Sequence, residues 1–297
     1  MTHMKQKVGL IGLGNAGLAL ATPVLRNFSV VGYDRDEARR NLARNAGVGI
    51  AGSVQAVAEQ CEIVLLSLPD PAISKTVIAE IGTETLAKRL IVETSTVTPQ
   101  DIDDLVRIAA PAGATVMDSA IVGGVHKLSE GRTTFLVGAS DKDFERAKPV
   151  LESAAEKIFH LGPAGSGMRA KLVNNAVAHA VMIVLIEAAA LAAAQGVPMD
   201  VFYELMRRES GLLRPLTHRF GERILTQHFE GGMSTANARK DSALILDMAR
   251  ELGVPVFAIS AAHTAYEIAM REGLERKDYS AVSKLWEKWV GIRFAAK

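Results

Sequence analysis

The sequence predicts an α/β domain built on a doubly wound sheet, followed by an all-α domain that a long helix joins to it. Up to residue 161, short apolar runs alternate with helical patterns, as in parallel sheets with crossover helices. From residue 171 onward the sequence shows helical patterns only. We place the boundary near Pro163, which gives domains 1–163 and 164–297.

The amino-acid composition excludes several classes of protein. The 297 residues, 48% of them hydrophobic, can form two domains with sizeable cores. The formal net charge is +1 and the basic residues are scattered, so we predict no nucleic-acid partner. The single cysteine, Cys61, excludes an internal disulfide and is typical of a buried residue in a reducing compartment. Residues 1–7 are polar and do not resemble a signal peptide, so we expect a cytoplasmic protein.

Residues 176–194 form an almost wholly apolar segment, about as long as a bilayer span. His179 and Glu187 interrupt the segment, and alanine dominates over leucine. We therefore expect a helix buried between domains or subunits, and no membrane anchor. A homodimer or homotetramer is expected, in which the C-terminal helices complete neighbouring sites.

The expected elements follow from apolar periodicity. The predicted strands are 8–11, 30–33, 63–68, 90–93, 115–117, 133–137 and 157–161. The predicted helices of the first domain are 18–26, 38–45, 54–59, 73–81, 101–110 and 143–156. Those of the second domain are 171–194, 200–208, 214–226, 235–252, 256–272 and 279–289.

A glycine-rich turn follows the first strand and leads into a helix. It has the form G-x-G-x-x-G and consists of Gly12, Leu13, Gly14, Asn15, Ala16 and Gly17. The glycines allow a tight turn and let backbone N–H groups approach a pyrophosphate at the start of the helix. Asp34 ends the second strand, where a carboxylate can accept hydrogen bonds from both ribose hydroxyls. This context predicts a Rossmann-type domain that binds a dinucleotide.

The residues after the second strand bear on the choice of cofactor. Asp34 favours NAD, because a carboxylate repels the 2′-phosphate of NADP. Arg35 directly after it could accommodate that phosphate, so NADP stays possible. Arg39 and Arg40 also complicate the choice, and their alternative role is to form part of a solvated helix face.

Further candidates lie at the carboxyl ends of later strands, where open parallel sheets bind ligands. We expect Leu68 and Pro69 to lie against the cofactor, and the Thr96 hydroxyl to bond ribose or nicotinamide. Thr98 before Pro99 is at least as typical of a helix cap. In the segment formed by Val122, Gly123 and Gly124, the paired glycines can turn successive N–H groups toward a substrate carboxylate, or form a simple turn. We assign no metal ligand.

One polar cluster stands near the start of the long helix. Lys171 and Asn175 are four residues apart and share one helix face, and Asn174 flanks it. A positioned lysine can exchange a proton with a carbonyl or hydroxyl oxygen, and an adjacent amide can orient the substrate. The alternative is a solvated surface lysine.

Over nearly its whole length, the chain resembles the β-hydroxyacid dehydrogenase family, which includes 3-hydroxyisobutyrate dehydrogenase and tartronate semialdehyde reductase. The family motifs G-x-G-x-M-G, S-T-x-x-P, D-x-P-V-S-G-G, G-x-G-x-x-x-K-x-x-N-N and K-D correspond to residues 12–17, 95–99, 118–124, 165–175 and 240–241. The resemblance implies that Lys171 is the catalytic acid/base and Asn175 a substrate ligand. It also implies that Lys240 lies beside the cofactor or closes the site.

Two departures from the family pattern stand out. Ala16 replaces methionine, which changes packing but little chemistry. Val122 replaces the serine that helps bind the substrate carboxylate, and one missing donor to a charged acceptor costs ~1.5–3 kcal/mol. This departure puts an ordinary small 3-hydroxy acid in doubt.

The predicted function is hydride transfer between a nicotinamide cofactor and a short β-hydroxy acid or its semialdehyde, with Lys171 exchanging the proton. One alternative is an imine or other carbonyl reductase on the same fold, although imine reductases typically lack this lysine. Another is a non-catalytic sensor or scaffold that binds NAD(P). Retention of Lys171, Asn175 and the paired glycines argues against it, because no structural role requires that combination.

Overall fold

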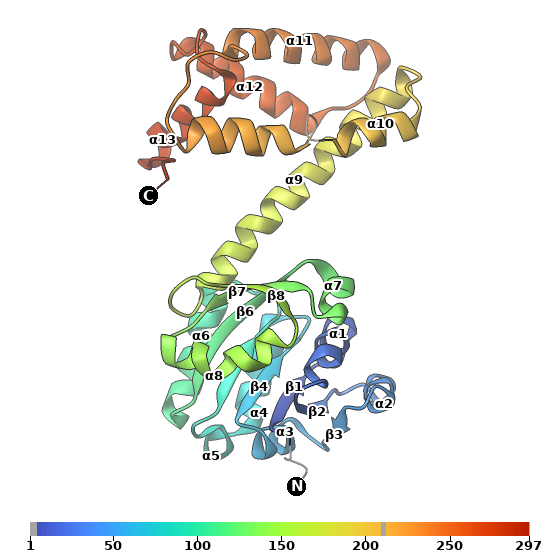
Figure 1. Cartoon of the computed structure of the whole chain (residues 1–297), viewed down its shortest axis with the longest axis vertical. Coiled ribbons are helices and arrows are strands. Elements are labelled where there is room, and N and C mark those ends of the chain that lie inside the picture. Colours follow the sequence, from blue (N-terminus) through green and yellow to red (C-terminus); the bar gives the residue numbers. More distant parts are fainter. Residues whose placement is uncertain (1–4, 209–211, 297) are drawn as a thin grey trace. The chain divides into compact units, whose positions relative to one another are not determined.

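The computed structural model describes residues 5–208 and 212–296. The chain divides into two compact units, Met1–Ala176 and Val177–Lys297 (Figure 1). The division falls within helix α9 (Ser166–Ala194), so the first turns of that helix belong to the α/β unit.

The α/β unit contains one sheet in which the described strands take the order β3-β2-β1-β4-β5-β6-β7-β8. Strands β1 to β6 are parallel, β7 runs antiparallel to β6, and β8 is parallel to β7. The strands are β1 (Lys7–Ile11), β2 (Ser29–Tyr33), β3 (Gly49–Ile50), β4 (Ile63–Leu66), β5 (Leu90–Glu93), β6 (Thr115–Val122), β7 (Thr133–Gly138) and β8 (Ala155–His160). This topology confirms the predicted doubly wound fold.

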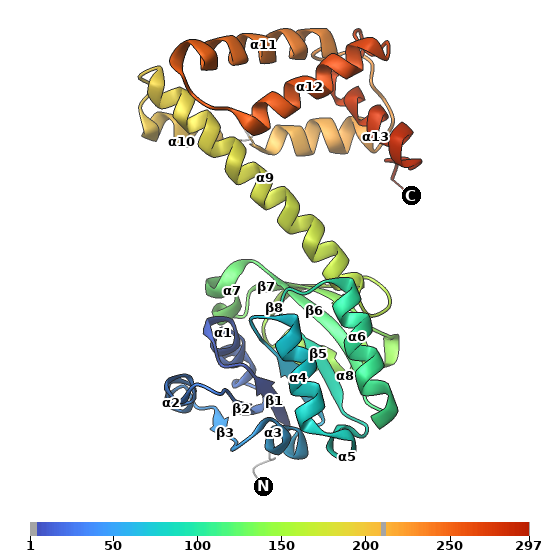
Figure 2. The ribbon, with the colours of Figure 1, turned by 180° about the vertical axis from the view of Figure 1, so that it is seen from behind.

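Helices cover both faces of the sheet. They are α1 (Asn15–Val24), α2 (Glu37–Asn45), α3 (Val54–Gln60), α4 (Pro71–Ile81), α5 (Thr83–Leu86), α6 (Pro99–Ala109), α7 (Gly124–Glu130) and α8 (Asp141–Glu152). Two opposite views show α8 over one face, and α4 and α6 over the other (Figures 1 and 2). Each face has its own buried apolar cluster, which is why the central strands read as continuous apolar runs. Cys61 is buried in the second cluster, as predicted.

The segment around the paired glycines differs from the prediction. The strand predicted to end at residue 117 continues to Val122, and helix α7 follows it directly where a turn was expected. Gly123 has φ +126°, a conformation that L side chains rarely adopt, and it provides the sharp change of direction. Only one side chain of this seven-residue helix, Leu128, is buried, so the sequence carries little helical periodicity.

Helix α9 begins at Ser166, before the predicted start at residue 171. Its length and composition would suffice to cross a membrane, and only 11% of its most apolar 18-residue stretch is buried. In the single chain the helix is therefore largely exposed, and its burial between domains or subunits stays a prediction. Large side chains such as Met182 and Ile186 are each 57% exposed.

The second unit is helical throughout its described part, as predicted. It contains α10 (Met199–Met206), a π-helix (Pro215–Ile224), α11 (Thr235–Leu252), α12 (Phe257–Arg271), a 3₁₀ turn (Tyr279–Val282) and α13 (Ser283–Val290). Helices α11 and α12 lie side by side (Figures 1 and 2). Within this unit, the Glu187 carboxylate accepts hydrogen bonds from the first three amides of α12, at 2.7–3.1 Å.

Candidate active site

A cavity of about 860 Å³ lies in the α/β unit at the carboxyl ends of the central strands. The turns after β1, β2, β4, β5 and β6 contribute to its wall, together with α4 and the start of α9. Strand order reverses between β1 and β4, which is where open α/β sheets form a ligand-binding crevice.

The glycine-rich turn forms one wall of the cavity. A Cβ at Gly12 would lie 2.1 Å from the Ser67 carbonyl oxygen, and one at Gly17 would lie 2.0 Å from that of Gly12, so both positions require glycine. A Cβ at Gly14 would meet nothing within 4 Å. Gly14 also caps helix α1, and no side chain there accepts from the first helical N–H groups. This turn therefore fits a pyrophosphate, as predicted from the sequence.

Asp34 joins the end of β2 to that turn. Its Oδ2 accepts a hydrogen bond from the Leu13 amide at 2.7 Å, and its Oδ1 accepts one from the Asp36 amide at 2.9 Å. The carboxylate also lines the cavity, where its remaining lone pairs can accept from ribose hydroxyls. Leu13 contributes only its amide, because its side chain is fully buried in the core and does not line the cavity.

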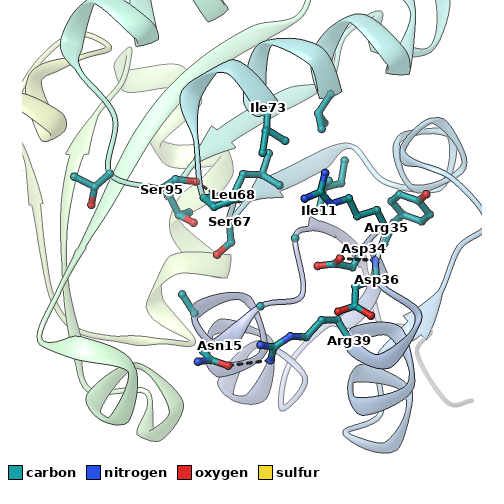
Figure 3. A pocket seen from close by; sticks show the side chains of 18 of the residues that line it. Ile11, Asn15, Asp34, Arg35, Asp36, Arg39, Ser67, Leu68, Ile73 and Ser95 are labelled. Carbon is teal, nitrogen blue, oxygen red and sulfur yellow. Dashed lines mark hydrogen bonds between the residues drawn. The ribbon is translucent and has the colours of Figure 1, made fainter.

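Three basic residues follow Asp34, and two of them line the cavity. Arg35 and Arg39 both line the cavity wall, and for Arg39 a solvated helix face was the alternative. Figure 3 shows Arg39 reaching across to Asn15, whose Oδ1 accepts from Nη1 at 2.9 Å. Arg40 donates instead to the Asp34 and Arg35 carbonyl oxygens.

The opposite wall comes from the turns after β4 and β5. Leu68, Pro69 and Thr96, the residues expected to contact the cofactor, line the cavity. The Leu68 amide donates to Ser95 Oγ at 2.7 Å, so the two turns are joined (Figure 3). Thr98 forms a capping box with Asp101 at the start of α6, which confirms the capping alternative.

Glu93 lies beneath this wall and was not predicted from the sequence. Its Oε1 accepts from the Ser95 amide at 2.9 Å, and its side chain is fully buried. Burial raises the pKa of Glu93, and hydrogen bonds from Ser74, Ser95 and Thr94 oppose that shift only in part. The sequence could have indicated this residue, because an acidic side chain stands directly before the hydroxyl-bearing segment Thr94-Ser95-Thr96.

Lys171 reaches the cavity from the second turn of α9. Its Nζ donates a hydrogen bond to the Ile121 carbonyl oxygen at 2.7 Å, near the end of β6. Burial lowers the pKa of Lys171 from its ordinary value. Gly124 lines the same cavity. The folded α/β unit thus brings the predicted proton-transfer group and the predicted cofactor turn to one cavity.

Other predicted site residues lie outside that wall. Val122 and Gly123 do not line the cavity, and the Val122 carbonyl oxygen accepts from the Thr133 hydroxyl at 2.8 Å. Asn174 and Asn175 hydrogen-bond to each other at 3.4 Å, with Asn174 exposed and Asn175 half-buried.

Lys240 belongs to the helical unit, on α11, where its Nζ lies 3.3 Å from Asp241. Within residues 5–208 and 212–296, no group of three or more His, Cys, Asp or Glu side chains could hold a metal ion.

Comparison with known proteins covers both halves of the chain. Residues 7–162 match the NAD binding domain of 6-phosphogluconate dehydrogenase, and residues 165–286 match the NAD-binding family of NADP-dependent 3-hydroxyisobutyrate dehydrogenase. The chain is 31% identical over 290 residues to 2-(hydroxymethyl)glutarate dehydrogenase of Eubacterium barkeri, covering 96% of each chain. It is 28% identical to the NAD-dependent L-serine dehydrogenase of Pseudomonas aeruginosa, covering 97% of this chain and 100% of the relative.

Solved structures show the same fold. An imine reductase from Pseudomonas sp. superposes with a TM-score of 0.86 at 20% identity, covering 95% of this chain and 99% of that one. The 3-hydroxyisobutyrate dehydrogenase of Mycobacterium tuberculosis gives 0.65 at 24% identity, with the same coverage. Because the two family matches follow each other along the chain and one relative exceeds 30% identity over nearly its full length, this chain belongs to the β-hydroxyacid dehydrogenase family and is an NAD(P)-dependent oxidoreductase acting on CH–OH groups.

Proposed function

We propose that this enzyme oxidises the carbinol of a short β-hydroxy acid, or reduces the matching semialdehyde, with Lys171 as the proton-transfer group. One observation carries the proposal: the half-buried Lys171 side chain lines the same cavity as the glycine-rich turn. In the oxidation the carbinol carbon loses a hydride and its hydroxyl loses a proton. Bound NAD(P)⁺ supplies the hydride acceptor, and Lys171 Nζ takes the proton.

The surroundings of Lys171 support this role. Its Nζ is held at 2.7 Å from the Ile121 carbonyl oxygen, so the amine has a defined position at the cavity wall. A lysine can act as a base only when neutral, and the lowered pKa that burial produces makes the neutral amine more accessible near working pH. In the reduction, the protonated amine returns the proton to the forming hydroxyl.

The substrate class follows from the relatives and from Val122. 2-(Hydroxymethyl)glutarate, 3-hydroxyisobutyrate and L-serine, the substrates in the names of the relatives, all carry a hydroxyl β to a carboxylate. Val122 offers no hydroxyl donor to that carboxylate. We propose that the Gly123 and Gly124 amides bind it instead, and that Asn175 orients the hydroxyl, with Asn174 beside it. The substrate is therefore a β-hydroxy acid held mainly by main-chain and carboxamide donors.

Replacing Lys171 with alanine tests the catalytic role. We expect kcat to fall ~10²–10⁴-fold, because that is the usual contribution of a general acid or base. The assay follows NADH or NADPH absorbance with 2-(hydroxymethyl)glutarate, 3-hydroxyisobutyrate, L-serine and their semialdehydes, and NADH fluorescence checks that cofactor binding persists. Near-wild-type turnover by K171A with intact NADH binding would exclude this role for Lys171.

Two other functions remain as outcomes of the same assay. Turnover of cyclic imines without turnover of any hydroxy acid would indicate an imine reductase. NADH binding without turnover of either class would indicate a sensor or scaffold. Retention of Lys171 at the cavity favours the hydroxy acid, since a donor that exchanges a proton with a hydroxyl has no use in mere cofactor binding.

We further propose that the enzyme prefers NAD and works as a cytoplasmic homodimer or homotetramer. Asp34 places a carboxylate on the cavity wall, where the 2′-phosphate of NADP would be repelled. The exposed apolar side chains of α9 are the surface that a second copy would cover. We propose that Lys240 acts beside the cofactor or closes the site in that assembly.

A further inference from the structure

We propose that Asp118 is a positioning residue that fixes the place of Lys171 by docking the start of α9 onto β6. The proposal rests on the role given to Lys171 above. Asp118 itself lies in the strand and is fully buried, so it acts through the helix rather than on the substrate.

Two contacts, three residues apart, join β6 to α9. At the first, Asp118 Oδ1 accepts from the Gly165 amide at 2.5 Å and Oδ2 accepts from the Met168 amide at 2.7 Å. At the second, Lys171 Nζ donates to the Ile121 carbonyl oxygen at 2.7 Å. Ile121 follows Asp118 by three residues on the strand, and Lys171 follows Met168 by three on the helix. The catalytic amine is thus one helical turn away from the carboxylate contact.

A carboxylate at this position also satisfies early N–H groups of α9 and interacts favourably with the helix dipole. A serine or aspartate directly before the helix could do the same locally. Here the cap comes from a strand 47 and 50 residues earlier in the chain, so it fixes the position of the helix as well as capping its start. This difference argues for positioning beyond simple capping.

Two backbone segments pack closely against Asp118. A Cβ at Gly167 would lie 2.2 Å from the Leu136 carbonyl oxygen and 2.7 Å from Asp118 Oδ2. A Cβ at Gly138 would lie 2.4 Å from Asp118 Oδ1. The backbones of α9 and β7 therefore approach the carboxylate directly, and Met168 beside it is fully buried.

The experiment measures the Lys171 amine directly in the full-length enzyme. Competitive labelling with acetic anhydride over a pH series, read by mass spectrometry, gives the pKa of Lys171 without any substrate. Burial lowers that pKa in the wild type, and no charged side chain among the described residues contributes to the shift of Lys171. Asp118→Asn keeps the volume of the side chain. Its NH₂ group is a donor, so one of the two backbone amides that now donate to the carboxylate would lose its acceptor.

The two possible effects of Asp118→Asn have opposite signs. If the start of α9 is no longer held against β6, the Lys171 amine becomes more exposed to water. We therefore expect the pKa of Lys171 to rise toward its ordinary 10.5. Loss of a nearby negative charge alone would lower that pKa. We also expect kcat to fall about 10²-fold, as for a misplaced catalytic group, while KM for NAD⁺ changes little. An unchanged or lowered pKa would overturn the proposal.

Asp143→Asn is the matched control. Asp143 is also a buried carboxylate that links a helix to β6, through Thr115 Oγ1 at 2.9 Å, but at the other end of the strand. We expect the pKa of Lys171 to stay at its wild-type value in this variant. An equal rise in both variants would mean general loosening and would overturn the proposal.

Asp118→Ser is a second variant, which keeps one acceptor oxygen without added bulk. NADH binding and a cooperative thermal transition establish that each variant is folded, and failure of both to fold would assign Asp118 to folding alone. If K171A keeps its activity, the proposed catalytic role fails. If K171A is inactive but Asp118→Asn leaves the pKa and kcat unchanged, only the positioning proposal fails.

Discussion

Lysines near a helix start mostly face water, and Lys171 differs because a main-chain carbonyl oxygen holds its ammonium at the cavity wall. Asp34 is a second polar residue on the cavity wall, beside the glycine-rich turn. One carboxylate there both fixes the glycine-rich turn through the Leu13 amide and faces the space that a ribose would occupy. Removing its charge should therefore change cofactor choice more than folding.

We predict that Asp34→Asn raises the ratio of kcat/KM for NADP to that for NAD by at least about 10-fold. A like-charge contact with the 2′-phosphate costs more than ~1.4 kcal/mol, and the asparagine removes it while Oδ1 can still accept from Leu13. Steady-state kinetics with both cofactors measure the ratio. Asp70→Asn, at the cap of α4 outside the cavity wall, should leave it unchanged. A ratio unaltered by Asp34→Asn would contradict the assignment.

At the scale of elements, the starts of α9 and α12 are each held by a side chain from a distant segment. Asp118 binds the start of α9, and Glu187 in the middle of α9 binds three amides at the start of α12. The local cap position of α12, Val256, has no side-chain acceptor, so the remote carboxylate replaces it. Burial alone would raise the pKa of Glu187, but the three amides outweigh it and the pKa lies below its ordinary value.

A lowered folded-state pKa means that the carboxylate stabilises the fold above the unfolded pKa, near ~4.3, and that this stability is lost as the pH falls through the folded value. We predict that Glu187→Gln lowers Tm by roughly 2–4 °C at pH 7, as expected for a lost helix cap. The difference from wild type should shrink below about pH 4. Thermal melts across this range test it, with the exposed Glu251→Gln as control. A constant difference down to pH 3 would contradict the charge-based explanation.

At the scale of the whole molecule, the two units differ in how much apolar surface one chain buries. The α/β unit has two large buried clusters, whereas the described part of the helical unit has one cluster of three buried residues, Ile224, Phe229 and Ala281. Many large apolar side chains of α9 to α13 are exposed instead. Soluble monomers rarely expose apolar surface of this kind, which supports the proposal that a second copy covers it.

We predict that the wild-type protein sediments as a dimer or tetramer, and that the double substitution of Met182 and Ile186 by lysine shifts it toward monomer. The two side chains are four residues apart on one face of α9, and each is 57% exposed. Gln195→Lys, also on exposed surface, adds one positive charge at a polar position and should leave the assembly intact. Analytical ultracentrifugation over a concentration series measures this. A wild-type monomer at every concentration would contradict the prediction.

The sequence by itself determined the features that depend on local order along the chain. Apolar periodicity predicted the parallel sheet and the helical second half, and the G-x-G-x-x-G turn with Asp34 predicted the dinucleotide site. The catalytic role of Lys171 was implied by the family resemblance. The short helix α7 was not predicted, because a helix with a single buried side chain shows no apolar periodicity in its sequence.

Only the tertiary structure decided which of the candidates share that cavity. It brought in Arg39 and left out Val122, whose carbonyl oxygen is bonded to Thr133. It also showed that Asp118 holds a helix 47 to 50 residues further along the chain. Such contacts depend on how strands and helices pack. Packing brings together residues that are far apart in the sequence, and no sequence periodicity indicates which of them meet. Local sequence patterns determined the helices, strands and motifs of this enzyme, and long-range packing determined which of their side chains meet.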